Sequence, residues 1–431
     1  MRLTRLCCNY FKRFTEWEMR HKTGTELKKP IYGWVRLGKK RWRYNQYHPT
    51  TPEALAFNIN TKDKNGQLFL QPIKDWTIFK GDRGDMSVGG TVPEGVLLGI
   101  CNPLLDIIIN ADQAFLDKYS LQSNDAIIAT DKHQEMFENM VNNYKPIYLA
   151  GGATQNSIRV AQWLLRTPKA TSFIGGVGKD KFHDILLKAA EKVGVNVQYE
   201  IHSDYSTGKC GAIITGEDRS LVTDLGAAQH FTVNFIQQPE IWQFFEKAKI
   251  FYIGGFIIPV SVETVLKTAK YAAETNKIVV MNLHARFLCK YFADPNLNLM
   301  QYVDVLFGNG DEAKQFGKCS GFDVDDVKGI ALKAEGLPKC NNKRKRTVVF
   351  TQGRDPTILA HDGQITEFPV TPVQKELIKD TNGCGDAFVG GFLSQLAQNK
   401  PLDRCMQCGF YASKVVIQHY GCNFPETPDF N

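Results

Sequence analysis

The sequence predicts an α/β fold in which a doubly wound, mostly parallel sheet is accompanied by a smaller β-sheet. Continuous apolar runs, which are typical of strands buried on both faces of a parallel sheet, alternate with segments whose apolar residues recur at helical spacing. This alternation starts at residue 96 and continues to the end of the 431-residue chain. Shorter strands with polar edges interrupt it within roughly 105–150 and 207–228, and we expect these strands to form the small sheet.

The net charge of +7 is concentrated at the start of the chain. Residues 1–95 carry a net charge of +9, whereas the remainder carries −2. These first residues also lack sustained periodicity, so we expect a basic, poorly ordered extension at 1–95 and the folded domain at 96–431. The basic cluster at 39–43 could serve nuclear import or weak nucleic-acid contact, although a solvated tail is the simpler interpretation.

The composition favours a soluble, cytoplasmic protein, with nuclear entry left open by the basic cluster. Hydrophobic residues make up 43% of the chain, but no apolar run approaches the ~18 residues of a membrane span. No signal peptide precedes the eleven cysteines, so we expect reduced thiols. Cys405 and Cys408 have C-x-x-C spacing but no further ligands, and they fall on a helical pattern; this predicts one helix face rather than a metal or redox site.

The first predicted strand, Val96–Ile100, is an uninterrupted apolar run. It leads into Asn102 and Asp106. In open α/β sheets ligands bind beyond the carboxyl ends of the strands, so this pair could hold the two hydroxyls of a sugar. A polar turn with an acidic residue at a strand edge is the alternative.

A second strand runs from Ile147 to Ala150 and enters a helix through Gly151 and Gly152. Glycines allow a ligand to approach the backbone, although close packing of the strand on the helix would also select them. Asn156 follows about one turn into the helix, where it could reach the same ligand.

The remaining elements continue the alternation. Strands are predicted at 107–110, 126–130, 171–177, 211–215, 221–224, 250–253, 278–282, 303–307, 347–351, 357–360 and 364–368, and helices at 181–193, 239–247, 262–274, 309–316, 325–334, 383–398 and 402–419. The basic run Lys343–Arg346 precedes one of these strands and is expected to be a solvated loop. No G-x-x-x-x-G-K-[ST] and no G-x-G-x-x-G after the first strand is present, which excludes a P-loop and gives a dinucleotide site no support.

Two polar segments follow strands late in the chain. Asn309-Gly310-Asp311-Glu312 opens a helix, where its oxygen-bearing side chains could hold Mg²⁺ directly or through water, or could simply cap the helix. Thr351-Gln352-Gly353-Arg354 follows the next strand. Together with the segment described next, it would make the carboxyl edge of the sheet a cleft of nucleotide size.

The most informative stretch is Asp380-Thr381-Asn382-Gly383-Cys384-Gly385-Asp386, a turn that becomes a helix. A helix start offers free backbone N–H groups and a partial positive charge, which together favour phosphate. Asp386 would repel an anion there unless it served another purpose, such as accepting a proton from an attacking hydroxyl. A phosphate site beside a base suggests phosphoryl transfer; a glycine turn capped by Asp386 is the alternative.

Three of these motifs together resemble the ribokinase-like (PfkB) carbohydrate kinase family. Gly151-Gly152 with Asn156, and the stretch from Asp380 to Phe388, look like the two family signatures, and Asn309 with Glu312 resembles its N-x-x-E magnesium motif. The likeness covers about 95–431 and is greatest to the members that phosphorylate adenosine. It is carried by Gly99–Asp106, Ala150–Trp163, Phe307–Asn309, Phe350–Arg354 and Gly421–Phe430.

The resemblance implies a reaction and a role for each matching residue. ATP would phosphorylate the 5′-hydroxyl of adenosine, with Asp386 as the base and the backbone amides of Gly383, Cys384, Gly385 and Asp386 as the anion hole. The other implied roles are ribose binding by Asn102 and Asp106 with Gly151, Gly152 and Asn156; base binding by Phe256, Phe287, Leu221 and Leu225; neutralisation of phosphate charge by Arg219; contact with ATP by Thr351, Gly353 and Asn382; and Mg²⁺ placement through water by Asn309 and Glu312.

Cys384 departs from the family pattern, which usually has alanine between the two glycines. A thiol at a helix N-terminus is expected to have a lowered pKa, so we expect sensitivity to thiol reagents at this residue.

The expected ligands are therefore adenosine and ATP, with Mg²⁺. We expect the protein to be a monomer that needs no nucleic acid or membrane. Two alternatives stay open: another ribokinase-like kinase for a different nucleoside or sugar, and a nucleoside-binding protein without catalysis.

Overall fold

The computed structural model describes residues 31–36, 42–47, 57–62, 68–72, 92–123, 125–216 and 218–430. The chain separates into two compact units, residues 1–77 and 78–431. In the first unit, β1 (Ile31–Arg36) pairs antiparallel with β2 (Trp42–Tyr47), and β3 (Phe57–Lys62) pairs with β4 (Leu68–Pro72). Residues 39–41 of the basic cluster lie outside the described residues, and the boundary at residue 95 stays a prediction.

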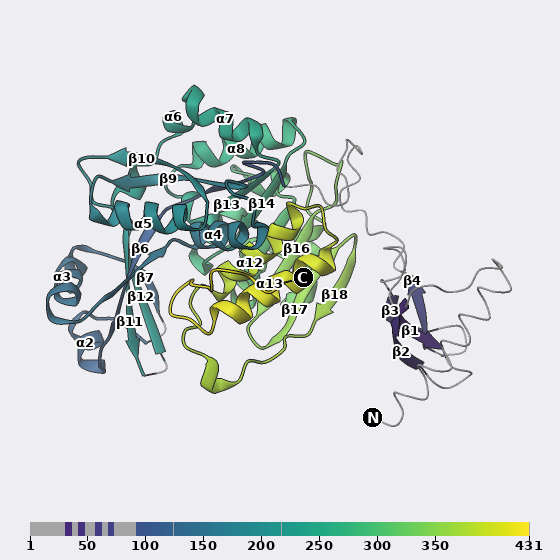
Figure 1. Ribbon diagram of the computed structural model, residues 1–431. Helices are drawn as coiled ribbons and strands as arrows, with labels where there is room; N and C mark the ends of the chain where they lie inside the picture. The colour runs from purple at the N-terminus through teal and green to yellow at the C-terminus, as the bar shows by residue number, and fades with distance from the viewer. Residues whose placement is uncertain are drawn as a thin grey trace. The chain divides into compact units, whose positions relative to one another are not determined.

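The second unit contains the predicted large sheet (Figure 1). Its strand order is β10-β9-β5-β13-β14-β15-β16-β17-β18, parallel from β10 to β16 and antiparallel on both sides of β17. The strands are β5 (Leu97–Ile100), β9 (Thr171–Gly178), β10 (Asn196–His202), β13 (Ile250–Gly254), β14 (Ile278–Asn282), β15 (Val305–Asn309), β16 (Thr347–Gln352), β17 (Asp355–His361) and β18 (Gln364–Phe368).

The sheet grows in both directions from its centre. From β5 the chain continues toward β9 and β10, whereas from β13 it continues toward β16. Because right-handed crossovers in opposite directions place helices on opposite faces, a crevice opens at the carboxyl ends of β5 and β13. Asn102, which was predicted to follow the carboxyl end of the first strand, lies just after β5 at this switch point.

The helices of the second unit cover this sheet. In Figure 1, α4, α12 and α13 lie together in front of it, and α12 contacts both of the others; α8 contacts β13 and β14, and α11 contacts β16 and β17. The bounds are α4 (Ala153–Leu165), α5 (Lys181–Lys192), α6 (Val233–Ile236), α7 (Pro239–Lys247), α8 (Val262–Glu274), α9 (Cys289–Phe292), α10 (Gly310–Cys319), α11 (Val327–Glu335), α12 (Cys384–Leu396) and α13 (Leu402–Val416). No helix in the described ranges is long and apolar enough to span a bilayer.

The predicted small sheet is also present, with strand order β7-β12-β11-β6-β8. Its strands are β6 (Leu104–Asn110), β7 (Ala126–Ile128), β8 (Ile147–Gly151), β11 (Lys209–Thr215) and β12 (Asp218–Asp224). It has its own hydrophobic core with α2 (Gln113–Lys118) and α3 (Gln134–Asn143), and α5 packs against strands of both sheets. An α/β fold with a large, mostly parallel sheet and a second, smaller sheet is therefore confirmed.

The sequence analysis missed the elements α2, α3, α6, α9 and β10 of the second unit. Strand β10 lies at the edge of the sheet and mixes polar with apolar residues, so it lacks the apolar run that marked its neighbours. Cys405 and Cys408 lie buried in α13, as the helical pattern predicted.

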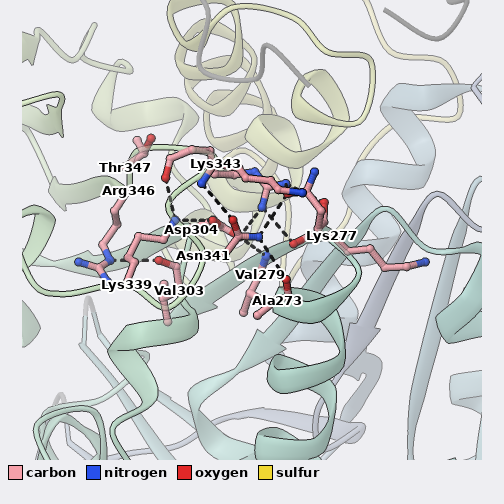
Figure 2. Close-up of polar contacts among 12 residues, drawn as sticks. Ala273, Lys277, Val279, Val303, Asp304, Lys339, Asn341, Lys343, Arg346 and Thr347 are labelled. Carbon is pink, nitrogen blue, oxygen red and sulfur yellow. Dashed lines mark hydrogen bonds and ion pairs between the residues drawn. The ribbon is translucent and has the colours of Figure 1, made fainter. Parts of the chain in front are cut away.

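The prediction of a solvated loop at 343–346 is wrong for two of its residues. Arg346 is fully buried and donates hydrogen bonds to the carbonyl oxygens of Val303, Ala334 and Leu337 at 2.7–3.0 Å, among others. Arg344 pairs with buried Asp304. Asp304 also binds Lys339 (Figure 2). The two arginines satisfy backbone carbonyls at the amino edge of the sheet and the end of α11, a use of positive charge that a local sequence pattern does not reveal.

We predict that Arg346→Met lowers the free energy of unfolding by about 3 kcal/mol or more, because several buried carbonyl groups lose their donor together. Thermal and denaturant unfolding provide the measurement. The matched control is Lys345→Met, since the Lys345 side chain is 69% exposed and its removal should change stability little. Equal effects of the two substitutions would contradict the structural role of Arg346.

Candidate active site

A cavity of about 1130 Å³ lies between the carboxyl edge of the large sheet and the small sheet. One side is lined by residues that follow β5, β13 and β14, by Asn309 at the end of β15 and by residues of α10. Residues from β6, β7 and β12 line the other side. It brings together thirteen of the predicted site residues: Asn102, Asp106, Gly152, Asn156, Leu221, Leu225, Phe256, Phe287, Asn309, Glu312, Asn382, Gly383 and Asp386.

Six predicted residues do not line this cavity. Gly151 and Arg219 lie in strands of the small sheet, and Cys384 and Gly385 form the first turn of α12. Thr351 is the next-to-last residue of β16, where it pairs with Asn309 of β15, and Gly353 follows the strand with φ +62°.

Asp386 lies in the first turn of α12, three residues after the N-cap Gly383. Gly383 has φ +76°, a conformation that side chains disfavour, and this turns the chain into the helix. The Asn156 amide donates a hydrogen bond to Asp386 Oδ2 at 3.1 Å. Burial nevertheless raises the pKa of Asp386 to about 7, which places its titration in the range useful to a general base.

Asn102, which follows β5, and Asp106 of β6 line opposite sides of the cavity. Asn102 Nδ2 donates to the carbonyl oxygen of Phe256 at 3.1 Å, which joins the segments after β5 and β13. The buried Oδ1 atoms of Asn102 and Asn156 accept no hydrogen bond from the described residues, as expected of groups that await a ligand. Burial raises the pKa of Asp106 to about 7. A Cβ at Gly151 would lie 2.3 Å from Asp106 Oδ1, so close packing against this carboxylate requires the glycine.

Asn309 and Glu312 form a reciprocal cap on α10. Glu312 N–H donates to Asn309 Oδ1 at 2.8 Å, and the backbone N–H of Asn309 donates to Glu312 Oε2 at 2.9 Å. Burial raises the pKa of Glu312 to about 7. Within the described ranges no three histidine, cysteine, aspartate or glutamate side chains gather as a metal site. Asn309 and Glu312 therefore cap α10, which was the alternative interpretation of this motif, and Glu312 also lines the cavity.

The aromatic pair lies at one end of the cavity. The ring centroids of Phe256 and Phe287 are 6.3 Å apart with the planes tilted by 51°, so the rings contact each other. His284, which the sequence analysis missed, lines the cavity beside Phe256 with φ +59°, and burial keeps its imidazole neutral by lowering its pKa to about 3. Only its position after β14 could have indicated it.

Arg219 of β12 forms an ion pair with Asp380, the residue that opens the turn before α12. This contact joins the small sheet to the predicted phosphate site. The sequence analysis gave Asp380 no role, although it belongs to the same motif as Asp386.

The expected lowering of the Cys384 pKa is wrong. Burial raises the pKa of this thiol to about 12, and the negative charges of Asp380 and Asp386 act in the same direction. Because the thiolate is the reactive form of cysteine, we expect Cys384 to react slowly with alkylating reagents.

Comparison with known proteins agrees with this architecture. Residues 113–429 match the pfkB family carbohydrate kinase model. Adenosine kinase 1 of Arabidopsis thaliana is 48% identical over 338 residues, which span 78% of this chain and 98% of that protein. Adenosine kinase of Schizosaccharomyces pombe is 40% identical over 77% of this chain and 96% of its own length.

Solved structures give the same result. The crystal structure of Anopheles gambiae adenosine kinase in complex with P1,P4-di(adenosine-5) tetraphosphate superposes with a TM-score of 0.76 at 42% identity, over 78% of this chain and all of that one. Schistosoma mansoni adenosine kinase in complex with 2-fluoroadenosine gives 0.74 at 32% identity, over 78% and 98%.

The chain therefore belongs to the pfkB carbohydrate kinase family, and the predicted ribokinase-like fold is confirmed. Within that family it is similar to the adenosine kinases.

We predict that Cys384→Ala and the wild-type protein lose activity at the same slow rate in iodoacetamide at pH 8, because a thiol with a pKa of about 12 is almost entirely protonated there. Mass spectrometry should show alkylation of the exposed Cys319 and Cys340 first. Faster inactivation of the wild type, with label on Cys384, would contradict the raised pKa.

Proposed function

We propose that this protein transfers the γ-phosphate of ATP to the 5′-hydroxyl of adenosine, giving AMP and ADP. The observation that carries the proposal is the position of Asp386, a cavity-lining carboxylate in the first turn of α12, where the helix also offers backbone N–H groups to an anion. A base and an anion site at one helix start suit in-line phosphoryl transfer, in which positioning and electrostatics supply most of the rate.

In the proposed reaction Asp386 accepts the proton of the 5′-hydroxyl as that oxygen forms its bond to the γ-phosphorus. The bond from the γ-phosphorus to the bridging oxygen breaks, and ADP leaves. The backbone N–H groups from Gly383 through Asp386, Cys384 and Gly385 included, stabilise the negative charge on the transferring group. Asn102 and Asp106 bind the ribose hydroxyls, and Asn156, which donates to Asp386, keeps the base oriented.

The remaining residues bind the adenine and the ATP. Phe256 and Phe287, with Leu221 of β12 and Leu225 just after that strand, enclose the adenine. Thr351, Gly353 and Asn382 follow the ATP, since β16 ends beside β15 on the same edge. Closure of the small sheet over the adenosine excludes water during transfer.

Mg²⁺ is the metal that the donor set suits, because Asn309 and Glu312 offer hard oxygen ligands beside Asp386 and few carboxylates are needed when the ion keeps its waters. When bound, Mg²⁺ neutralises charge on the ATP phosphates. Glu312 is held for this role by its hydrogen bonds from Asn309.

We further propose a cytoplasmic monomer that needs neither nucleic acid nor membrane, with nuclear entry dependent on the basic segment. The nine cysteines in the described part of the chain are all free, which suits a reducing compartment.

We predict that Asp386→Asn lowers kcat by about 10²–10⁴-fold while adenosine still binds, because the amide cannot accept the proton. For the wild type, kcat/KM should fall as the pH drops below about 7, since the pKa of Asp386 is raised to that value and only the ionised form acts as a base. A coupled assay of ADP release and calorimetric titration with adenosine measure both quantities. Retained turnover in Asp386→Asn would exclude this residue as the base.

A panel of substrates distinguishes the proposed function from its two alternatives, a kinase for another nucleoside or sugar and a nucleoside-binding protein without catalysis. We predict that adenosine is phosphorylated with a higher kcat/KM than ribose, because the aromatic end of the cavity can stack on a base. Inosine and guanosine in the same panel determine which base is preferred. Preference for ribose would favour a sugar kinase. Adenosine binding without any formation of AMP would favour a binding protein.

A further inference from the structure

The side chain of Asp380 joins three elements that are distant in the sequence. Its Oδ1 accepts the backbone N–H of Asn382 at 2.9 Å, within the turn before α12, and its Oδ2 accepts the N–H of Gly421 at 2.8 Å. Arg219 of the small sheet completes the set with an ion pair. The Asp380 side chain is only 3% exposed, so each of these bonds is made away from bulk water.

The turn is also held from the side of the C-terminal segment 421–430. Gly383 packs so closely on Cys422 that a Cβ would lie 3.0 Å from the Cys422 Cβ. This segment is fixed in turn on α4, where Phe424 stacks on Trp163 with ring centroids 4.8 Å apart. The Asp380–Gly421 hydrogen bond therefore connects the turn, through the C-terminal segment, to α4.

The negative charge of Asp380 would oppose phosphate binding at the turn unless another group offset it. The turn must admit a polyanionic phosphate, yet carboxylates of Asp380 and Asp386 lie at its two ends. Arg219 offsets the charge of Asp380, and the ion pair can form only while the small sheet lies over the turn.

We infer that Asp380 is a positioning residue: its carboxylate orders the anion-hole turn and, through Arg219, couples that order to the position of the small sheet. The inference rests on the proposed function, because it assigns the turn to phosphoryl transfer. Asp380 itself acts through the backbone of residues 382–386 and takes no part in the proton transfer.

Substitution of Asp380 by asparagine tests whether the carboxylate itself is needed or only a side chain of that size. An amide of the same size has one acceptor oxygen, so Asp380→Asn can keep the bond from Asn382 N–H or that from Gly421 N–H, but its NH₂ group then faces a donor. It also removes the charge that holds Arg219. We expect kcat to fall by about 10²-fold, because a small displacement of the anion hole is costly, while adenosine affinity changes little.

The matched control is Asp304→Asn. Asp304 is likewise 3% exposed, binds Lys339 at 2.6 Å and accepts the N–H of Val279 at 2.9 Å, but it precedes β15 at the opposite edge of the sheet from the cavity. This variant should lose thermal stability and keep the wild-type kcat per folded molecule. Equal kcat in Asp380→Asn and Asp304→Asn would overturn the inference.

Amide hydrogen exchange gives a readout independent of turnover. Exchange at residues 381–386 should accelerate in Asp380→Asn and also in Arg219→Met, which leaves the Asp380 carboxylate in place and serves if the first variant folds poorly. Unchanged exchange in Arg219→Met would refute the coupling to the small sheet. If the wild type made no AMP, the proposed function would fail, whereas the exchange measurement would still decide whether Asp380 orders the turn.

Discussion

The burial of three carboxyl groups around one cavity is the constraint on which much of this structure depends. Asp106, Glu312 and Asp386 each lose hydration, and the pKa of each is raised to about 7. Such groups are tolerated only where donors and positive charge surround them. The donors and positive charge come from two helix N-termini, the Asn156 amide and the Arg219 cation. The elements that carry these groups meet near the switch point of the sheet.

The two edges of the large sheet differ in what surrounds them. The large sheet presents its carboxyl edge to the cavity, and its amino edge is locked by Asp304, Lys339 and the buried Arg346. The small sheet has a separate hydrophobic core and reaches the catalytic edge through side chains such as Arg219. Stiffness at one edge and a separately packed sheet at the other suit an enzyme whose site is completed by closure.

The sequence predicted the parts of the fold that depend on local patterns. Buried strands such as β5 are continuous apolar runs, and glycines mark the turns into α4 and α12, so the architecture and cavity residues such as Asn102, Asn156 and Asp386 could be anticipated. Phe256 and Phe287 were indicated only by the family resemblance. Effects that depend on distant partners were missed. Asp380 is bonded by Gly421 and Arg219, and Arg346 binds carbonyl oxygens of residues 300–303 and 334–338. Burial raises the pKa of the Cys384 thiol. Local pattern carries no information on such partners.

The contact between Phe256 and Phe287 affects the free energy of the proposed base binding. The ring centroids lie 6.3 Å apart and Phe287 is 49% exposed, so both rings are partly hydrated and partly covered by each other. A base that entered between them would have to separate the rings first, and it would replace their mutual contact by one contact with each ring. The affinity for a base would therefore include the cost of breaking this contact.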